Sequence, residues 1–66
     1  MPKFSLKAAR VNAKLTISQV AEAVDKSEST IKSWEAGKTF PTPPMIDKLC
    51  ELYGIAYDYI DFNPRS

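Results

Sequence analysis

The chain has 66 residues, of which 44% are hydrophobic and 26% charged, and its net charge is +1. This length predicts one small domain, and the composition excludes a disordered chain. With no histidine and a single cysteine, Cys50, the sequence offers no metal-ligand cluster, no internal disulfide and no nucleophile paired with a base. We therefore expect neither an enzyme nor a bound cofactor.

Charge is distributed unevenly along the chain. Residues 1–44 hold seven Lys or Arg against four Asp or Glu, giving +3, whereas residues 45–66 hold two against four, giving −2. Any surface that faces phosphate groups is therefore expected on the first two thirds of the chain. Neither an apolar run that could span a bilayer nor a signal-type leader is present, which predicts no membrane association and a cytoplasmic location.

The first half of the chain predicts two short helices. Ser5 is placed to cap a helix over residues Leu6–Ala13. Thr16 and Gln19 have the spacing of a capping box, which starts a second helix that ends near Asp25. The apolar positions of this second helix recur at helical spacing: Val20, Ala21 and Val24.

A third helix follows after a sharp turn at Asp25 and Lys26. Ser27 is its expected N-cap and Gly37 its stop, so the helix covers about residues 28–36 and crosses the second helix steeply. When Ile31 and Trp34 point inward, an outward face remains that is small, polar and cationic: Ser29, Lys32, Ser33 and Ala36. Such a face is common on solvated helices, but it also suits the major groove of DNA, which admits one helix.

The rest of the chain completes an all-α, compact five-helix domain with no strand. Prolines in the loop KTFPTPP delay the fourth helix, which covers Met45–Tyr53 with Thr42 as its cap and Pro43 or Pro44 in its first turn. Gly54 ends it. A short fifth helix is expected over Tyr57–Phe62, followed by a tail at 63–66.

The chain resembles the phage-repressor/Cro-like (XRE-type) helix-turn-helix family along nearly its whole length. The most specific match is the pattern SxxxIxxWExG from Ser27 to Gly37. Further matches are Leu6, Arg10, Leu15-Thr16, Ala21, Pro41 and the ending from Gly54-Ile55 to Ile60. This resemblance implies a lambda-repressor-like fold, with the helix-turn-helix at the second and third helices and the third as recognition helix.

Carried over position by position, the resemblance also implies site residues. Base contacts are implied for Glu28, Ser29, Lys32 and Ser33. Contacts to the DNA backbone are implied for Thr16, Ser27, Lys38 and Thr39, and a structural ion pair for Arg10 and Glu35. Two positions depart from the family pattern. Ile17 stands where relatives commonly have a DNA-binding glutamine, so we expect it to pack instead, and Asp25 replaces the usual glycine of the turn.

Some residues outside the helix-turn-helix have competing interpretations. Cys50 is expected to be a buried core thiol, whereas Phe40 either packs against the core or contacts the sugar–phosphate backbone. The C-terminal segment is unusually aromatic, and relatives often dimerise through this end. We therefore expect a homodimer surface there, made of Tyr57, Tyr59 and Phe62.

The leading hypothesis is a small Cro-type repressor of a phage or mobile element, acting in the cytoplasm of a bacterial host. Its partners would be double-stranded operator DNA and a second copy in a weak or DNA-assisted homodimer. The 66 residues leave no room for an effector domain, which favours this type over two-domain repressors. The alternative is an interaction module with the same fold: an antirepressor, or an antitoxin, that meets a protein partner such as a repressor or a toxin.

Overall fold

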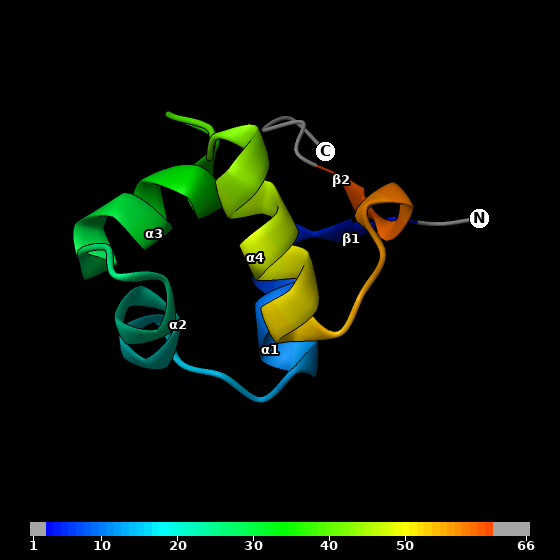
Figure 1. The fold of residues 1–66 in the computed structure, drawn as a ribbon, viewed down its shortest axis with the longest axis horizontal. Coiled ribbons are helices and arrows are strands. Elements are labelled where there is room, and N and C mark those ends of the chain that lie inside the picture. Colours follow the sequence, from blue (N-terminus) through cyan, green and yellow to red (C-terminus); the bar gives the residue numbers. More distant parts are fainter. Residues whose placement is uncertain (1–2, 62–66) are drawn as a thin grey trace.

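The computed structural model describes residues 3–61. Within this range four α-helices follow one another: α1 (Leu6–Asn12), α2 (Ile17–Val24), α3 (Glu28–Ala36) and α4 (Pro43–Tyr53). A short strand precedes them, and a single 3₁₀ turn and a second strand follow: β1 (Phe4–Ser5), η1 (Tyr57–Tyr59) and β2 (Ile60–Asp61). In Figure 1, α2 and α3 form one end of the molecule, the strands and η1 form the other, and α1 and α4 lie between them.

Polar N-cap side chains begin three of the helices at the expected positions, which are Ser5, Thr16 and Ser27. The hydroxyl of Ser5 accepts the N–H of Ala8 at 3.0 Å at the start of α1. Both bonds of the predicted capping box of α2 are present, because Thr16 Oγ1 accepts from Gln19 N and Gln19 Oε1 accepts from Thr16 N. Thr42 precedes α4 but makes no capping bond through its side chain, so Pro43 and Pro44 set that start by their fixed φ.

Each of the four helices is followed, at its C-cap or one residue later, by a residue in the left-handed backbone conformation. These residues are Lys14 (φ 62°), Asp25 (φ 58°), Gly37 (φ 78°) and Gly54 (φ 67°). In each case the next N–H donates to the carbonyl five residues before it, at 2.9–3.2 Å, which satisfies a helix-terminal carbonyl. The left-handed turn at Asp25 was expected, but the one at Lys14 was not, because lysine rarely adopts this conformation.

The core lies where α1, α2, α3, α4 and β2 meet. Its buried apolar residues are Leu6, Ala9, Val20, Ala21, Val24, Ile31, Leu49, Tyr53 and Ile60. Trp34 and Cys50 pack against this core but are half-buried, so Cys50, which was expected as a buried core thiol, lies at the edge of the core. Ile17 also packs against the core, as expected for an apolar residue in place of glutamine. None of the helices within residues 3–61 is long and apolar enough to cross a membrane.

The described residues are mostly helical and compact, as expected for an all-α helix-turn-helix domain, but the expected fifth helix is not present among them. Within the described residues, the segment expected as a fifth helix forms only the 3₁₀ turn η1 and then the extended strand β2. Strand β2 pairs in parallel with β1, with Phe4 opposite Ile60 and Ser5 opposite Asp61. The extended backbone buries Ile60 to 3% exposure. Phe62, the expected helix end, and the expected tail at 63–66 lie outside the described residues.

Candidate nucleic-acid interface

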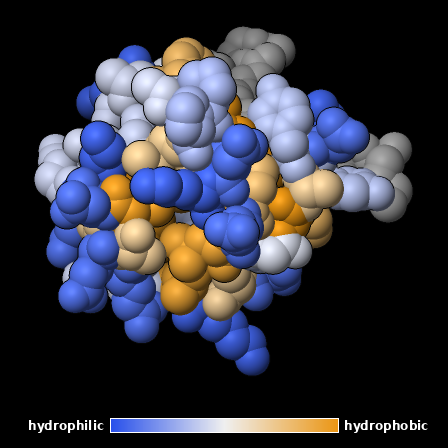
Figure 2. Space-filling model, viewed as in Figure 1, coloured by the Kyte–Doolittle hydropathy of each residue, from blue (hydrophilic) through white to orange (hydrophobic). Residues whose placement is uncertain are grey.

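Helices α2 and α3 form a compact unit because the turn between them is tight and their contact is close. Asp25, in the left-handed conformation, reverses the chain, and Lys26 N–H donates to the carbonyl of Ala21 at 2.9 Å. The small side chain of Ala21 is only 5% exposed, which lets the two helices approach closely. Ile31 is 1% exposed and fastens α3 to the core by its inner face. The end of the molecule that α2 and α3 occupy is mostly hydrophilic in Figure 2.

The outer face of α3 contains an open hollow of about 330 Å³. Three of the four implied base contacts line this hollow: Ser29, Lys32 and Ser33. The implied backbone contact Lys38 and the small apolar residue Ala36 complete the lining. Glu28 lies outside this lining, exposed in the first turn of α3, where a carboxylate interacts favourably with the helix dipole. The short side chains leave room for a base edge, and the two ammonium groups favour an anionic partner.

Two pairs of hydroxyl groups order the ends of α3. At its start, Ser27 Oγ accepts the N–H of Thr30 at 3.1 Å and lies 2.9 Å from Thr30 Oγ1. At its end, Ser33 Oγ lies 2.9 Å from Thr39 Oγ1, and either oxygen can be the donor. Three residues implied as DNA contacts are therefore held in defined positions before any DNA is bound: Ser27, Ser33 and Thr39.

The remaining implied backbone contacts are exposed. The Thr16 hydroxyl accepts a hydrogen bond within its capping box, so its proton is still available to a phosphate oxygen. Lys38 is exposed at the edge of the hollow. Phe40 is 57% exposed and is not among the residues packed against the core, which contradicts the interpretation that it packs there. The neighbouring Pro41 is the buried residue of this loop.

Behind α3, Arg10 and Glu35 form an ion pair between α1 and α3. Arg10 Nε donates to Glu35 Oε2 at 2.7 Å, Nη2 donates to Oε1 at 3.3 Å, and Nη1 donates to the carbonyl of Leu15 at 2.9 Å. The two side chains are 11% and 8% exposed. The hydrogen bond to Glu35 is the main cause that raises the pKa of Arg10. The negative charge of Glu35 is thus balanced by Arg10 on the inner side of α3.

Tyr53 was not singled out from the sequence. Its side chain is 7% exposed, and its hydroxyl is buried without a hydrogen-bond partner among residues 3–61. The pKa of Tyr53 is raised to about 12, chiefly by burial and also by the charge of Glu35, while Arg10 opposes both effects. Helical spacing places Tyr53 on the inner face of α4, but it gives no sign that the hydroxyl lacks a partner.

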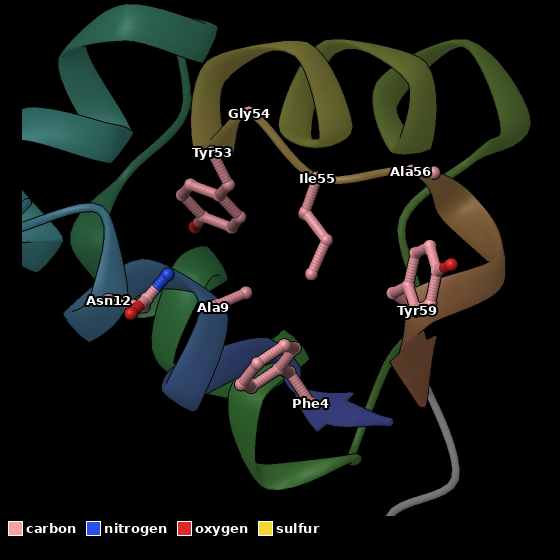
Figure 3. A pocket seen from close by; sticks show the side chains of 8 residues that line it. All are labelled: Phe4, Ala9, Asn12, Tyr53, Gly54, Ile55, Ala56 and Tyr59. Carbon is pink, nitrogen blue, oxygen red and sulfur yellow. The ribbon is translucent and has the colours of Figure 1, made fainter. Parts of the chain in front are cut away.

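At the other end of the molecule a second pocket, of about 450 Å³, lies between α1, the end of α4 and η1. In Figure 3, Ile55 points between the rings of Tyr53 and Tyr59, and Phe4 lies across from it. Tyr59 is 39% exposed and Tyr57 57%, consistent with surface positions, whereas Phe62 lies outside the described residues. Sequence reasoning missed Phe4, which is 43% exposed beside the same pocket because β1 carries it there.

Two helices joined by a tight turn, with the second exposed on its outer face, are the arrangement of a helix-turn-helix DNA-binding domain. A family model described as helix-turn-helix matches residues 6–60, and the chain belongs to this family, in its phage-repressor/Cro-like (XRE-type) form. It is accordingly a DNA-binding transcription regulator. Comparison with curated proteins and with solved structures gave no match.

Proposed function

We propose that this protein is a small Cro-type repressor of a phage or mobile element that binds operator DNA through α3. The observation that carries the proposal is the hollow on α3, where Ser29, Lys32, Ser33 and Lys38 converge on one exposed face. In this arrangement α3 enters the major groove, Ser29, Lys32 and Ser33 meet base edges, and Lys38 meets phosphate. Glu28, at the exposed start of the helix, is placed to accept from a cytosine amine. Repression follows because the bound protein blocks access of the polymerase.

Backbone contacts position α3 in the groove. Thr16 at the start of α2 and Ser27 at the start of α3 are both exposed N-caps, and the N–H groups of a helix start favour a phosphate. Lys38 and Thr39 follow the end of α3 and supply the contact on its other side. Phe40, exposed in the same loop, rests against a sugar. These contacts carry no sequence information and set the register of the base-reading residues.

We further propose that two copies pair through the pocket end of the molecule. The exposed rings of Phe4 and Tyr59 lie beside an apolar pocket, so each copy offers both a projection and a hollow on one face (Figure 3). A two-fold interface requires such self-complementarity. This end lies away from α3, so pairing leaves both recognition helices open (Figure 1). Two-fold pairing suits two half-sites about 34 Å apart. The small size of the pocket fits a weak or DNA-assisted dimer.

The test is an electrophoretic mobility shift with the intergenic DNA next to the gene and with random DNA of equal length, each at two salt concentrations. The proposal expects tighter binding to the intergenic DNA and weaker binding at the higher salt concentration. Equal binding to both DNAs would contradict a sequence-specific repressor. Absence of any salt-sensitive binding would favour the alternative function, an antirepressor or antitoxin that acts through a protein partner.

A further inference from the structure

The hydroxyl pair at the end of α3 connects a residue on the base-facing hollow to one in the loop that follows. Ser33 Oγ and Thr39 Oγ1 lie 2.9 Å apart, and Ser33 lines the hollow. The backbone holds this pair in place, because Gly37 is left-handed and Lys38 N–H donates to the carbonyl of Ser33 at 3.0 Å. Ser33 is therefore tied to the loop twice, once through its carbonyl and once through its hydroxyl.

The chemistry of two paired hydroxyl groups limits what each can do outside the pair. A hydroxyl has one proton to donate and two lone pairs that accept. One of the two protons is used between Ser33 and Thr39, so a single proton is left for an external acceptor. Whichever residue uses that proton leaves the other with lone pairs alone. The direction of the internal hydrogen bond thus decides whether Ser33 presents a donor or only an acceptor to the groove.

A DNA phosphate would fix that direction. Phosphate oxygens accept hydrogen bonds and have none to donate, so Thr39 must spend its proton on a phosphate that it contacts. The oxygen of Thr39 then receives the proton of Ser33, and Ser33 Oγ keeps only lone pairs. Exposed Lys38, next to Thr39 in the chain, favours a phosphate at this position.

We propose, on the basis of the proposed function, that Thr39 acts as a positioning residue that makes Ser33 a pure hydrogen-bond acceptor toward the major groove. Only two groups in the major groove donate hydrogen bonds, the N6 amine of adenine and the N4 amine of cytosine. Ser33 therefore selects adenine or cytosine at one position of each half-site. It disfavours guanine and thymine, whose O6 and O4 atoms meet its lone pairs with another acceptor.

The experiment measures the base preference of the full chain by competition among duplexes that differ at one position of the half-site at a time. The parent chain is expected to prefer adenine or cytosine on the order of tenfold at one position, and S33A is expected to lose this preference there. In T39V the shape is kept but the hydroxyl is lost, so Ser33 regains its proton as a donor. At that same position T39V should accept guanine and thymine within about twofold of adenine and cytosine.

Two further variants serve as matched controls. T39S retains a hydroxyl and should keep the parent's preference, while the double variant S33A/T39V should show the same lack of preference as S33A alone. The four variants combine three substitutions of small side chains, and circular dichroism checks the helix content of each variant. The inference is overturned when T39V keeps the full preference, or when the preference that S33A removes is for guanine or thymine. If the parent chain binds no DNA in a salt-sensitive manner, the proposed function fails first, and the inference fails with it.

Discussion

Arg10 and Glu35 join the first helix to the recognition helix through two hydrogen bonds between their side chains, at 2.7 and 3.3 Å. The third guanidinium nitrogen holds the carbonyl of Leu15 in the loop before α2. Three segments are thus fixed by one side chain: α1, the α1–α2 loop and α3. Because the pair lies behind α3, it sets where the recognition helix stands without using its outer face.

Breaking this ion pair is expected to destabilise the fold severely. Arg10→Ala leaves the Glu35 carboxylate, 8% exposed, without its partner and should cost about 3 kcal/mol. A domain of this size has only about 3–10 kcal/mol of total stability, so such a loss shifts the urea midpoint strongly. The double variant Arg10→Met/Glu35→Leu removes both charges and should recover most of the loss. If the free energy of unfolding of Arg10→Ala lies within about 0.5 kcal/mol of that of the parent chain, the ion pair has no structural importance.

The raised pKa of Tyr53 predicts that the folded protein loses stability at high pH. Its pKa is raised from 10 to about 12 in the folded protein, so the folded state disfavours the phenolate. The folding stability linked to this raised pKa is fully present below pH 10. It is lost as the pH rises toward 12, because the tyrosine in the unfolded chain releases its proton at the lower pH. Urea unfolding of the parent chain and of Tyr53→Phe across this range would reveal the difference, with tyrosinate absorbance reporting the ionisation. Parallel pH profiles of the two proteins would contradict the prediction.

At neutral pH the same substitution is expected to be harmless. The Tyr53 hydroxyl is buried without a partner among residues 3–61, and removing it also removes a polar group that folding strips of water. Tyr53→Phe should therefore match the parent chain or exceed its stability by about 1 kcal/mol. A thermal melt at neutral pH checks this, and a clearly lower midpoint for Tyr53→Phe would show that the hydroxyl has a stabilising contact.

The two left-handed residues that are not glycine offer sites for stabilisation. Lys14 and Asp25 have φ angles of 62° and 58°, a conformation that costs a residue with a side chain about 1–2 kcal/mol. Lys14→Gly and Asp25→Gly should each raise the free energy of unfolding by about 0.5–1 kcal/mol, after the greater entropy of glycine in the unfolded chain is subtracted. Ala13→Gly is the matched control, because Ala13 is right-handed and should lose stability instead. Urea titration measures all three, and equal losses at all positions would contradict strain at Lys14 and Asp25.

The local features of the fold could be predicted from the sequence, but its long-range pairing could not. The caps at Ser5, Thr16 and Ser27 and the left-handed turn at Asp25 depend on residues within a few positions of one another, so spacing reveals them. The strand at Ile60 depends on Phe4 and Ser5, at the opposite end of the chain. Nothing in the sequence next to Ile60 distinguishes this strand from a short helix. For the same reason the sequence did not predict that Phe4 lies exposed beside the pocket between α1, the end of α4 and η1.

The candidate site divides in a similar way. Helical periodicity predicts that Ser29, Lys32 and Ser33 share a face, and the structure places all three on one hollow. The contact of Arg10 with Glu35 spans 25 residues of sequence and was expected from family resemblance rather than from any periodicity. The bond between Ser33 and Thr39 was not expected at all, because it depends on how the chain turns after Gly37.

Lys32 and Lys38 should differ in what their loss does to DNA binding. Lys32→Ala removes a group placed to meet guanine O6 or N7 and should relax base preference at one position, at a cost of about 1–3 kcal/mol. Lys38→Ala removes a phosphate contact, so it should weaken all sequences alike and reduce the slope of log affinity against log salt by about 1. Binding measured at several salt concentrations on specific and random duplexes separates the two. If both variants are equally impaired on both duplexes, Lys32 is not a base reader.

The pocket between α1 and η1 predicts cooperative binding to paired half-sites. Tyr59→Ser removes an exposed ring beside the pocket, in a 3₁₀ turn that contributes no buried residue to the core, and it lies at the end of the molecule away from α3. The affinity for a single half-site should therefore stay unchanged. A duplex with two half-sites about one helical turn apart should lose its cooperative step, so that the two copies bind independently. Val11→Ser is the control, since Val11 is also an exposed apolar residue, at 56%, but does not line the pocket. Retained cooperativity in Tyr59→Ser, or an equal loss in Val11→Ser, would place the contact between copies elsewhere on the surface.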